Sequence, residues 1–263
     1  MVSRRSQPVD GFQLAYDDHG EGEGAAVVLP HGWPGDRNDF RDVVPRLAPH
    51  RRVVVPDLRG FGDLDKHDAD PARQYGADAQ VRSVVGLITE LGLGAVVVGG
   101  YDVGSGVAHT LAYHRPDLLH AMVLAPPMPG IGDRTLPAES QREFWYQSFH
   151  RLALADQLLD GRPDAVRPYL RFFWERWSGP DFVVNESQLE RLTANYSSPG
   201  AFRASIAWYR AGPDAYTLNR PVPAPPVPVS TPSPCCGQIT TRCSHARGRM
   251  PSISSTTTSI FNR

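Results

Sequence analysis

Short β-branched runs alternate with amphipathic stretches along the first half of the chain, and this alternation restricts the possible fold more than any other feature. The runs at 25–29, 52–56, 95–98 and 122–124 are rich in valine and leucine, as buried strands are. Stretches with helical spacing lie between them, at about 38–47, 77–91 and 105–114. This order predicts an α/β architecture, with a mostly parallel sheet covered by helices on both faces.

The strand–helix rhythm stops after the run at 122–124. Residues 128–215 are rich in Trp, Phe, Tyr, Arg and Leu at helical spacing, with turn signals such as Gly161-Arg162-Pro163. We therefore expect a core over residues 1–127 and a helical cap, or lid, over residues 128–215. Residues 216–263 would begin the C-terminal part of the core and then continue into an aberrant tail.

The tail begins near Pro221 and differs from everything before it. It holds eight Pro and 13 Ser or Thr but no Asp or Glu, although the preceding residues carry all 28 acids. All three cysteines also lie there, so the body of the protein is expected to use no disulfide or cysteine-bound metal. Two interpretations stay open, a disordered tail or translation in a shifted reading frame. In both, the last strands of the core would be missing or disordered.

Composition also limits the partners of the protein. A formal net charge of −1 and a pI near 6.8 provide no basic surface, so nucleic acid is not expected. The sequence contains no run of 18 apolar residues, so a membrane span is not expected. The first residues are not followed by the apolar segment of a secretory signal, so we expect a cytoplasmic protein. The glycines at 20–24 precede a strand instead of linking a strand to a helix, which argues against a dinucleotide cofactor. The sequence leaves the oligomeric state open.

Three glycine-containing motifs follow predicted strands. The first is His31-Gly32-Trp33-Pro34, which could aim backbone N–H groups at a developing oxyanion, and the second is the loop that starts at Asp57-Leu58-Arg59-Gly60. The third, Gly100-Tyr101-Asp102-Val103-Gly104, opens a helix, and its flanking glycines are typical of the sharp turn that exposes a nucleophile. The nucleophile would here be the carboxylate of Asp102. The alternative is that Asp102 only caps the helix.

These motifs resemble the α/β-hydrolase superfamily and, within it, the epoxide hydrolases. The three motifs occur in the family's order, and the resemblance extends over about residues 8–225. Within the predicted cap, Tyr146 in the segment 144–149 and Tyr209 in the segment 208–210 resemble the two family segments whose tyrosines hydrogen-bond the epoxide oxygen.

The resemblance implies a mechanism and a substrate class. Asp102 would attack an epoxide carbon and form an alkyl-enzyme ester, while Tyr146 and Tyr209 would donate protons to the leaving oxygen. The oxyanion of the following step would lie on the backbone N–H groups of Trp33 and Val103, with the Trp33–Pro34 peptide expected to be cis. The substrate would be a small apolar epoxide, with no cofactor, and its pocket would be lined by His31, Pro34, Trp145 and Trp208.

The sequence departs from the family in the rest of the catalytic triad. The family's histidine follows the last strand and its acid ends the strand before, but His245 and the residues at 226–230 lack these contexts, and Pro126-Pro127 stands where some relatives place the acid. We therefore expect epoxide attack with impaired hydrolysis of the ester. The alternatives are a non-catalytic or poorly folding truncated product, or a related hydrolase such as a dehalogenase. Val103 argues against dehalogenases, which typically carry Trp or Arg after the nucleophile.

Overall fold

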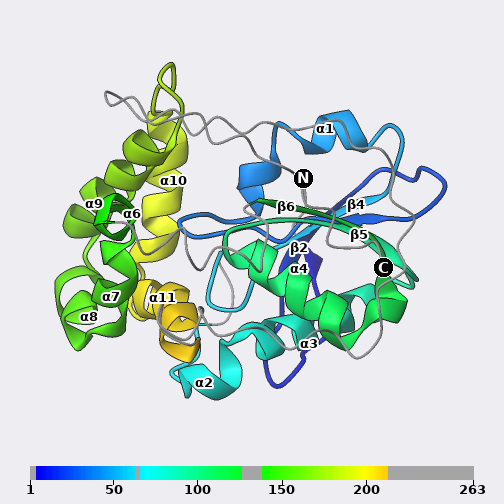
Figure 1. The fold of residues 1–263 in the computed structure, drawn as a ribbon, viewed down its shortest axis with the longest axis horizontal. Coiled ribbons are helices and arrows are strands. Elements are labelled where there is room, and N and C mark those ends of the chain that lie inside the picture. The colour runs from blue at the N-terminus through cyan, green and yellow to red at the C-terminus, as the bar shows by residue number, and fades with distance from the viewer. Residues whose placement is uncertain (1–3, 63–65, 126–137, 213–263) are drawn as a thin grey trace.

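The computed structural model of the chain describes residues 4–62, 66–125 and 138–212. Within them one sheet has the strand order β1-β2-β4-β3-β5-β6 (Figure 1). The pairs β3–β4, β3–β5 and β5–β6 are parallel, whereas β1 and β2 join the edge in antiparallel fashion, so the predicted α/β fold with a mostly parallel sheet is confirmed. The strands are β1 (Arg4–Arg5), β2 (Ala15–His19), β3 (Val27–Val28), β4 (Val53–Pro56), β5 (Val96–Tyr101) and β6 (Leu119–Ala125).

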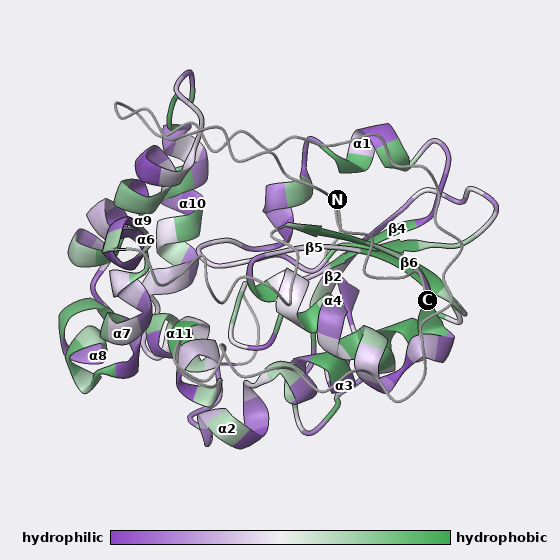
Figure 2. Ribbon diagram, viewed as in Figure 1, coloured by the Kyte–Doolittle hydropathy of each residue, from purple (hydrophilic) through white to green (hydrophobic). Residues whose placement is uncertain are grey.

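The central strands are buried on both faces, which explains why they read as continuous apolar runs. Because side chains alternate along a strand, Val28, Val54 and Val98 join the core cluster on one face of the sheet. Val53 and Val55 face the other way and join a smaller cluster that includes residues of helix α1. In Figure 2 strand β4 is accordingly largely green, the colour of hydrophobic residues.

Helices cover the two faces of the sheet, as expected. The long helices α3 (Ala77–Glu90) and α4 (Val103–His114) lie on one face, and the short helix α1 (Val44–Leu47) lies on the other (Figure 1). Helix α2 (Pro71–Gln74) and the 3-10 turns η1 (Arg37–Phe40) and η2 (Pro116–Leu118) complete this part of the chain.

The predicted continuous helix at 38–47 is wrong. The segment splits into η1 and α1, and Asp36 caps η1 by accepting a hydrogen bond from the Asn38 N–H at 2.9 Å. Pro45 lies in the first turn of α1, where its missing N–H costs nothing, but within one longer helix it would remove a backbone hydrogen bond and clash with the preceding turn. The antiparallel strands β1 and β2 were not predicted either, since their residues are largely polar.

Six helices between residues 138 and 211 form a group at one end of the sheet (Figure 1). We call them the outer helices. No helix in the described ranges is long and apolar enough to cross a membrane. The predicted boundaries at 127 and 215, the prolines at 126–127 and the tail lie outside the described residues. The outer helices are α6 (Ala138–Glu143), α7 (Trp145–Arg151), α8 (Ala153–Leu159), α9 (Pro163–Trp177), α10 (Glu186–Ser197) and α11 (Ala201–Ala211).

Polar contacts fasten the outer helices to the loop after β3. The buried carboxylate of Asp36 pairs with the Arg191 guanidinium and also accepts a hydrogen bond from the Asn195 amide at 3.1 Å. The Tyr196 hydroxyl donates to the Gly35 carbonyl at 2.9 Å and lies 3.0 Å from the Gly35 N–H. These bonds fix α10 directly above the turn that carries Trp33.

Candidate active site

Asp102 occupies the sharp turn between β5 and α4. Its backbone has φ 47° and ψ −114°, a conformation that a non-glycine residue rarely adopts. The turn is held by the Asp102 N–H, which donates to the Ala125 carbonyl at 2.8 Å, and by the Asp102 carbonyl, which accepts from the Gly106 N–H at 3.2 Å. The Asp102 side chain makes no N-cap hydrogen bond, and its carboxylate instead accepts from the N–H groups of Trp33 and of Val103, the first residue of α4, which argues against a purely capping role.

Close packing of backbone explains the glycines around Asp102. A Cβ on Gly100 would overlap the Gly104 carbonyl, and a Cβ on Gly104 would overlap the Pro30 carbonyl. A Cβ on Gly32 would lie 2.5 Å from the Tyr101 ring. The turn after β5 therefore packs backbone against backbone on the turn after β3, which is the arrangement that the sequence motif predicts.

This packing brings two backbone N–H groups to the Asp102 carboxylate. The Trp33 N–H donates to Asp102 Oδ2 at 2.8 Å. Burial raises the pKa of Asp102, while hydrogen bonds from the N–H groups of Trp33 and Val103 lower it, and burial prevails. The carboxylate is thus desolvated, and its oxygen already lies on the two donors that were expected to form an oxyanion hole.

Two buried tyrosines of the outer helices lie within electrostatic reach of this carboxylate. Tyr146 lies on α7 and Tyr209 on α11, and their ring centroids are 5.7 Å apart at an interplanar angle of 86°. Burial is the main cause that raises the pKa of each phenol, and the charge of Asp102 raises both further. The Tyr209 hydroxyl interacts with the Tyr146 hydroxyl, which contributes to the pKa shifts of both phenols, and has no other hydrogen-bond partner among the described residues. Both phenols therefore keep their protons at neutral pH within the electrostatic reach of Asp102.

The Trp33 indole lies in a cluster of aromatic rings that includes Tyr146, Tyr209 and Phe173. Its ring stacks on Tyr146 with centroids 5.6 Å apart, and it meets Tyr209 edge-on at 6.1 Å and Phe173 edge-on at 5.0 Å. The Trp145 ring stacks on the Phe173 ring, with centroids 6.0 Å apart, and Trp145 is 41% exposed. The surroundings of Asp102 are consequently aromatic and largely apolar.

The other predicted pocket residues lie at the margin of the site. His31 is fully buried, and its Nε2 accepts from the Leu58 N–H at 3.1 Å, so its Nδ1 donates to the Gly32 carbonyl at 2.8 Å. Burial lowers the pKa of His31, and the neutral ring braces two loops. Pro34 is buried, and the bond before it is cis, as expected. Trp208 packs against α4, where a Cβ on Gly106 would lie 3.0 Å from its ring.

His150 is a buried residue that the sequence analysis did not select. Its ring lies 4.5 Å from Trp33 and 4.8 Å from Tyr209, and its Nε2 is 3.0 Å from the Tyr169 hydroxyl. Burial, with a smaller effect of Arg210, lowers the pKa of His150 to about 3. Its position four residues after Tyr146 could have placed it on the same helix face.

Two buried or largely buried acids support the loops around the site: Asp57 from the expected loop after β4, and Asp39 from η1, within the segment predicted as a helix. Asp57 is buried, pairs with the Arg37 guanidinium and accepts the Arg37 N–H at 2.8 Å. Asp39 accepts a hydrogen bond from the hydroxyl of Tyr101, the residue that precedes Asp102 in the chain. Burial raises the pKa of Asp39 to about 6. Asp57 Oδ1 lies 3.9 Å from His31 Nε2, but this nitrogen accepts the Leu58 N–H, so within the described ranges neither carboxylate orients a histidine that is free to activate water.

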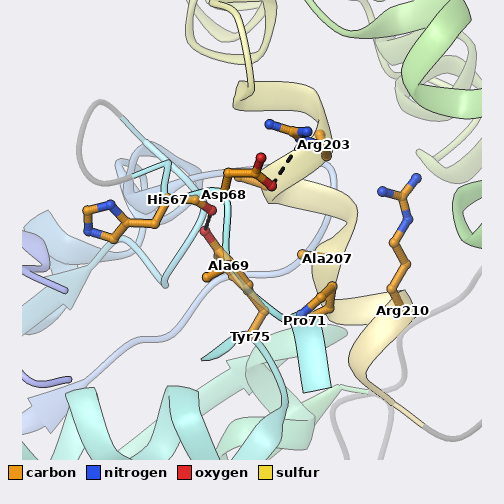
Figure 3. Close-up of a pocket in the computed structure, with 9 residues that line it drawn as sticks. His67, Asp68, Ala69, Pro71, Tyr75, Arg203, Ala207 and Arg210 are labelled. Carbon is orange, nitrogen blue, oxygen red and sulfur yellow. Dashed lines mark hydrogen bonds and ion pairs between the residues drawn. The ribbon is translucent and has the colours of Figure 1, made fainter. Parts of the chain in front are cut away.

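A separate cavity of about 210 Å³ lies between α11 and the segment that leads into α2 (Figure 3). Asp68 on one wall pairs with Arg203 on the other, at 3.5 Å, and Tyr75 closes the cavity toward the core. Asp102, Tyr146 and Tyr209 are not among its lining residues. This cavity is therefore distinct from the carboxylate site.

Comparisons with known proteins identify the family of the chain. The sequence matches the alpha/beta hydrolase fold family over residues 25–219, and the chain belongs to this family. Within it, the chain is epoxide hydrolase-like. It is 29% identical over 225 residues to the soluble epoxide hydrolase of Corynebacterium sp. (strain C12), covering 80% of this chain and 73% of that protein. The solved structure of the epoxide hydrolase CorEH without ligand matches with a TM-score of 0.70 and 28% identity, covering 81% of this chain and 74% of that one.

A relative of another activity also matches. The fluoroacetate dehalogenase of Burkholderia sp. is 26% identical over 215 residues, which cover 77% of this chain and 70% of that protein. The comparisons therefore support a hydrolase of epoxide hydrolase type.

Proposed function

We propose that this protein attacks small apolar epoxides through Asp102 and forms an alkyl-enzyme ester. The observation that carries the proposal is the convergence of one carboxylate and two phenols in a buried aromatic site. The Asp102 carboxylate is held by the Trp33 N–H at 2.8 Å, and its charge raises the pKa of both Tyr146 and Tyr209. A desolvated nucleophile opposite two proton donors is the arrangement that opening an epoxide requires.

In the first step, one Asp102 oxygen attacks an epoxide carbon and the carbon–oxygen bond of the ring breaks. The leaving oxygen takes a proton from Tyr146 or Tyr209, so the alkoxide never develops a full charge. The hydroxyls of Tyr146 and Tyr209 interact with each other, so both lie where they can reach the same leaving oxygen. The buried, aromatic surroundings favour an uncharged substrate, since burial of an ion without a partner costs several kcal/mol or more.

In the second step, water must attack the carbonyl carbon of the ester. The N–H groups of Trp33 and Val103 would bind the oxyanion, because they already contact the carboxylate. A base is needed to activate the water, and the described histidines around the site do not provide one. His31 has both ring nitrogens bonded to backbone, and the pKa of His150 is lowered to about 3. We therefore infer that the chain stalls at the ester.

A dehalogenase is the second candidate, because a fluoroacetate dehalogenase is among the relatives. A carboxylate substrate would need a cation close to the nucleophile. Among the described residues, the groups that hydrogen-bond the Asp102 carboxylate are backbone N–H groups, and the Tyr146 and Tyr209 side chains nearby keep uncharged phenols. Val103, the residue after Asp102, is a buried aliphatic side chain that cannot bind a halide by hydrogen bonding. These observations favour the epoxide.

The test is to incubate the protein with styrene oxide and measure its intact mass, followed by peptide mapping. We expect one added epoxide mass on Asp102 without multiple turnover, because loss of a general base slows hydrolysis by about 10²–10⁴. Fluoroacetate serves as the competing substrate, with fluoride release as its readout.

Variants make the test specific. Asp102→Asn should abolish the adduct, and Tyr146→Phe or Tyr209→Phe should slow its formation. Steady production of diol would show that the protein contains a working base, with His245 the first to examine. An absent adduct in the folded wild-type protein, or an adduct that persists in Asp102→Asn, would favour the non-catalytic interpretation.

A further inference from the structure

The two helices that carry Tyr146 and Tyr209 end beside each other. Helix α7 has only seven residues and α11 has eleven, so neither helix is long enough to be stable by itself. The last carbonyl groups of a helix have no partner within the helix, and a cation near them is favourable. How these two ends are held therefore determines where the two phenols lie.

An arginine of α7 caps the end of α11. Arg151 Nη1 donates to the Tyr209 carbonyl at 2.6 Å and to the Gly212 carbonyl at 3.1 Å. The first of these carbonyls belongs to the residue whose phenol faces Asp102. Arg151 itself lies five residues after Tyr146, in the last turn of α7.

An arginine of α11 caps the end of α7 in return. Arg210 Nε donates to the His150 carbonyl at 2.9 Å, and its Nη2 donates to the Leu152 carbonyl at 3.2 Å. The guanidinium is also held by both carboxylate oxygens of Asp156, at 2.8 and 3.0 Å. Arg210 directly follows Tyr209 in α11. Each of the two helices therefore supplies an arginine to the C-terminal end of the other.

We propose that Arg151 and Arg210 form a reciprocal clamp that positions the two phenols for epoxide opening. The clamp joins the C-terminal ends of α7 and α11 and so sets the 5.7 Å separation of the Tyr146 and Tyr209 rings. Both arginines act through the tyrosines and are positioning residues. The consequence for chemistry rests on the proposed function, whereas the clamp itself does not.

The first experiment tests the clamp by amide hydrogen exchange with mass spectrometry on the full chain. Each arginine donates to the other helix, so the effect of its loss should cross over. Arg151→Met should raise exchange in the last turn of α11, and Arg210→Met should raise exchange in the last turn of α7. Arg171→Met is the matched control, because Arg171 pairs with Glu175 and Glu186 on the exposed surface of the outer helices.

The second experiment measures the single-turnover rate of Asp102 alkylation by styrene oxide as a function of epoxide concentration. Arg151→Met and Arg210→Met should lower the maximal rate by about tenfold or more, with a smaller change in the half-saturating concentration, since misplacement by about 1 Å costs up to about 10²-fold. Arg151→Lys should recover part of the rate by keeping one donor. In a Tyr209→Phe background, Arg151→Met should have little further effect, because Arg151 holds the end of α11, the helix that carries this phenol.

The outcomes separate the two ideas. Crossed exchange together with a rate loss that depends on Tyr209 supports the clamp. Exchange that rises only in the helix of the substituted residue, or in neither helix, overturns it. Crossed exchange with an unchanged maximal rate, or with equal losses in the presence and absence of Tyr209, overturns the positioning role. An adduct that Asp102→Asn does not remove refutes the proposed function instead, and the exchange experiment still decides the clamp.

Discussion

Asp39 offers a sharp test of the electrostatics beneath the candidate site. Its carboxylate accepts hydrogen bonds from the Tyr101 hydroxyl and from the Asp36 N–H at 3.2 Å, yet burial raises its pKa from 3.8 to about 6. A carboxyl group with a raised pKa in the folded state stabilises the fold fully below pH 3.8. That stability is lost as the pH rises through about 6.

The size of the effect follows from this shift. Between pH 5 and pH 8, linkage with pKa values of 3.8 and about 6 removes about 1.4 kcal/mol from the free energy of unfolding. The Asp39 side chain keeps some contact with solvent, which reduces the expected loss to about 1 kcal/mol. Asn at this position cannot ionise and still offers a carbonyl oxygen to Tyr101, so Asp39→Asn should not show this loss.

The assay is urea unfolding followed by tryptophan fluorescence at pH 5 and pH 8. The free energy of unfolding of Asp39→Asn relative to wild type should increase by about 1 kcal/mol between the two pH values. The matched control is Asp42→Asn, since Asp42 is an exposed carboxylate only three residues away, and its difference from wild type should not change with pH. A difference for Asp39→Asn that stays constant or decreases from pH 5 to pH 8 would refute this account of the buried carboxylate.

Three further predictions concern the ion pair between Asp36 and Arg191, the sheet edge and the tail. Arg191→Met leaves the buried Asp36 carboxylate without its cation. It should therefore lower the free energy of unfolding at pH 7, measured by urea unfolding, by about 2 kcal/mol. A decrease below about 0.5 kcal/mol would contradict this account. Val123 lies on β6, the edge strand of the described sheet, and is 50% exposed, so we expect the protein to be poorly soluble. Val123→Lys should reduce self-association, measured by light scattering. A monodisperse wild-type monomer with a sharp thermal transition would argue against this expectation. If a frameshift produced the tail, another reading frame of the coding DNA beyond Arg220 should encode an apolar strand, an Asp and a Gly-His segment, and stop codons in both other frames would exclude that origin.

Much of the core could be predicted from sequence because its signals are local. The β-branched runs give strands β3 to β6 directly, and the glycines around Asp102 mark a turn that admits no Cβ. The helix at 38–47 failed as a prediction because Pro45 and the Asp36 cap divide it, although both signals are present in the sequence. Strands β1 and β2 carry polar residues, so their pairing is decided by the sheet edge that they join.

The sequence by itself determined which chemical groups are present: a carboxylate in a glycine-flanked turn, backbone donors after β3 and two tyrosines in a helical segment. Only the tertiary structure decided how these groups act on one another. It buries Asp102 so that its pKa rises although a helix begins behind it, and it brings His150 beside Trp33 from more than a hundred residues away. It also crosses Arg151 and Arg210 between two helix ends. Desolvation and contacts between distant segments depend on packing in three dimensions, and no local pattern of residues encodes them.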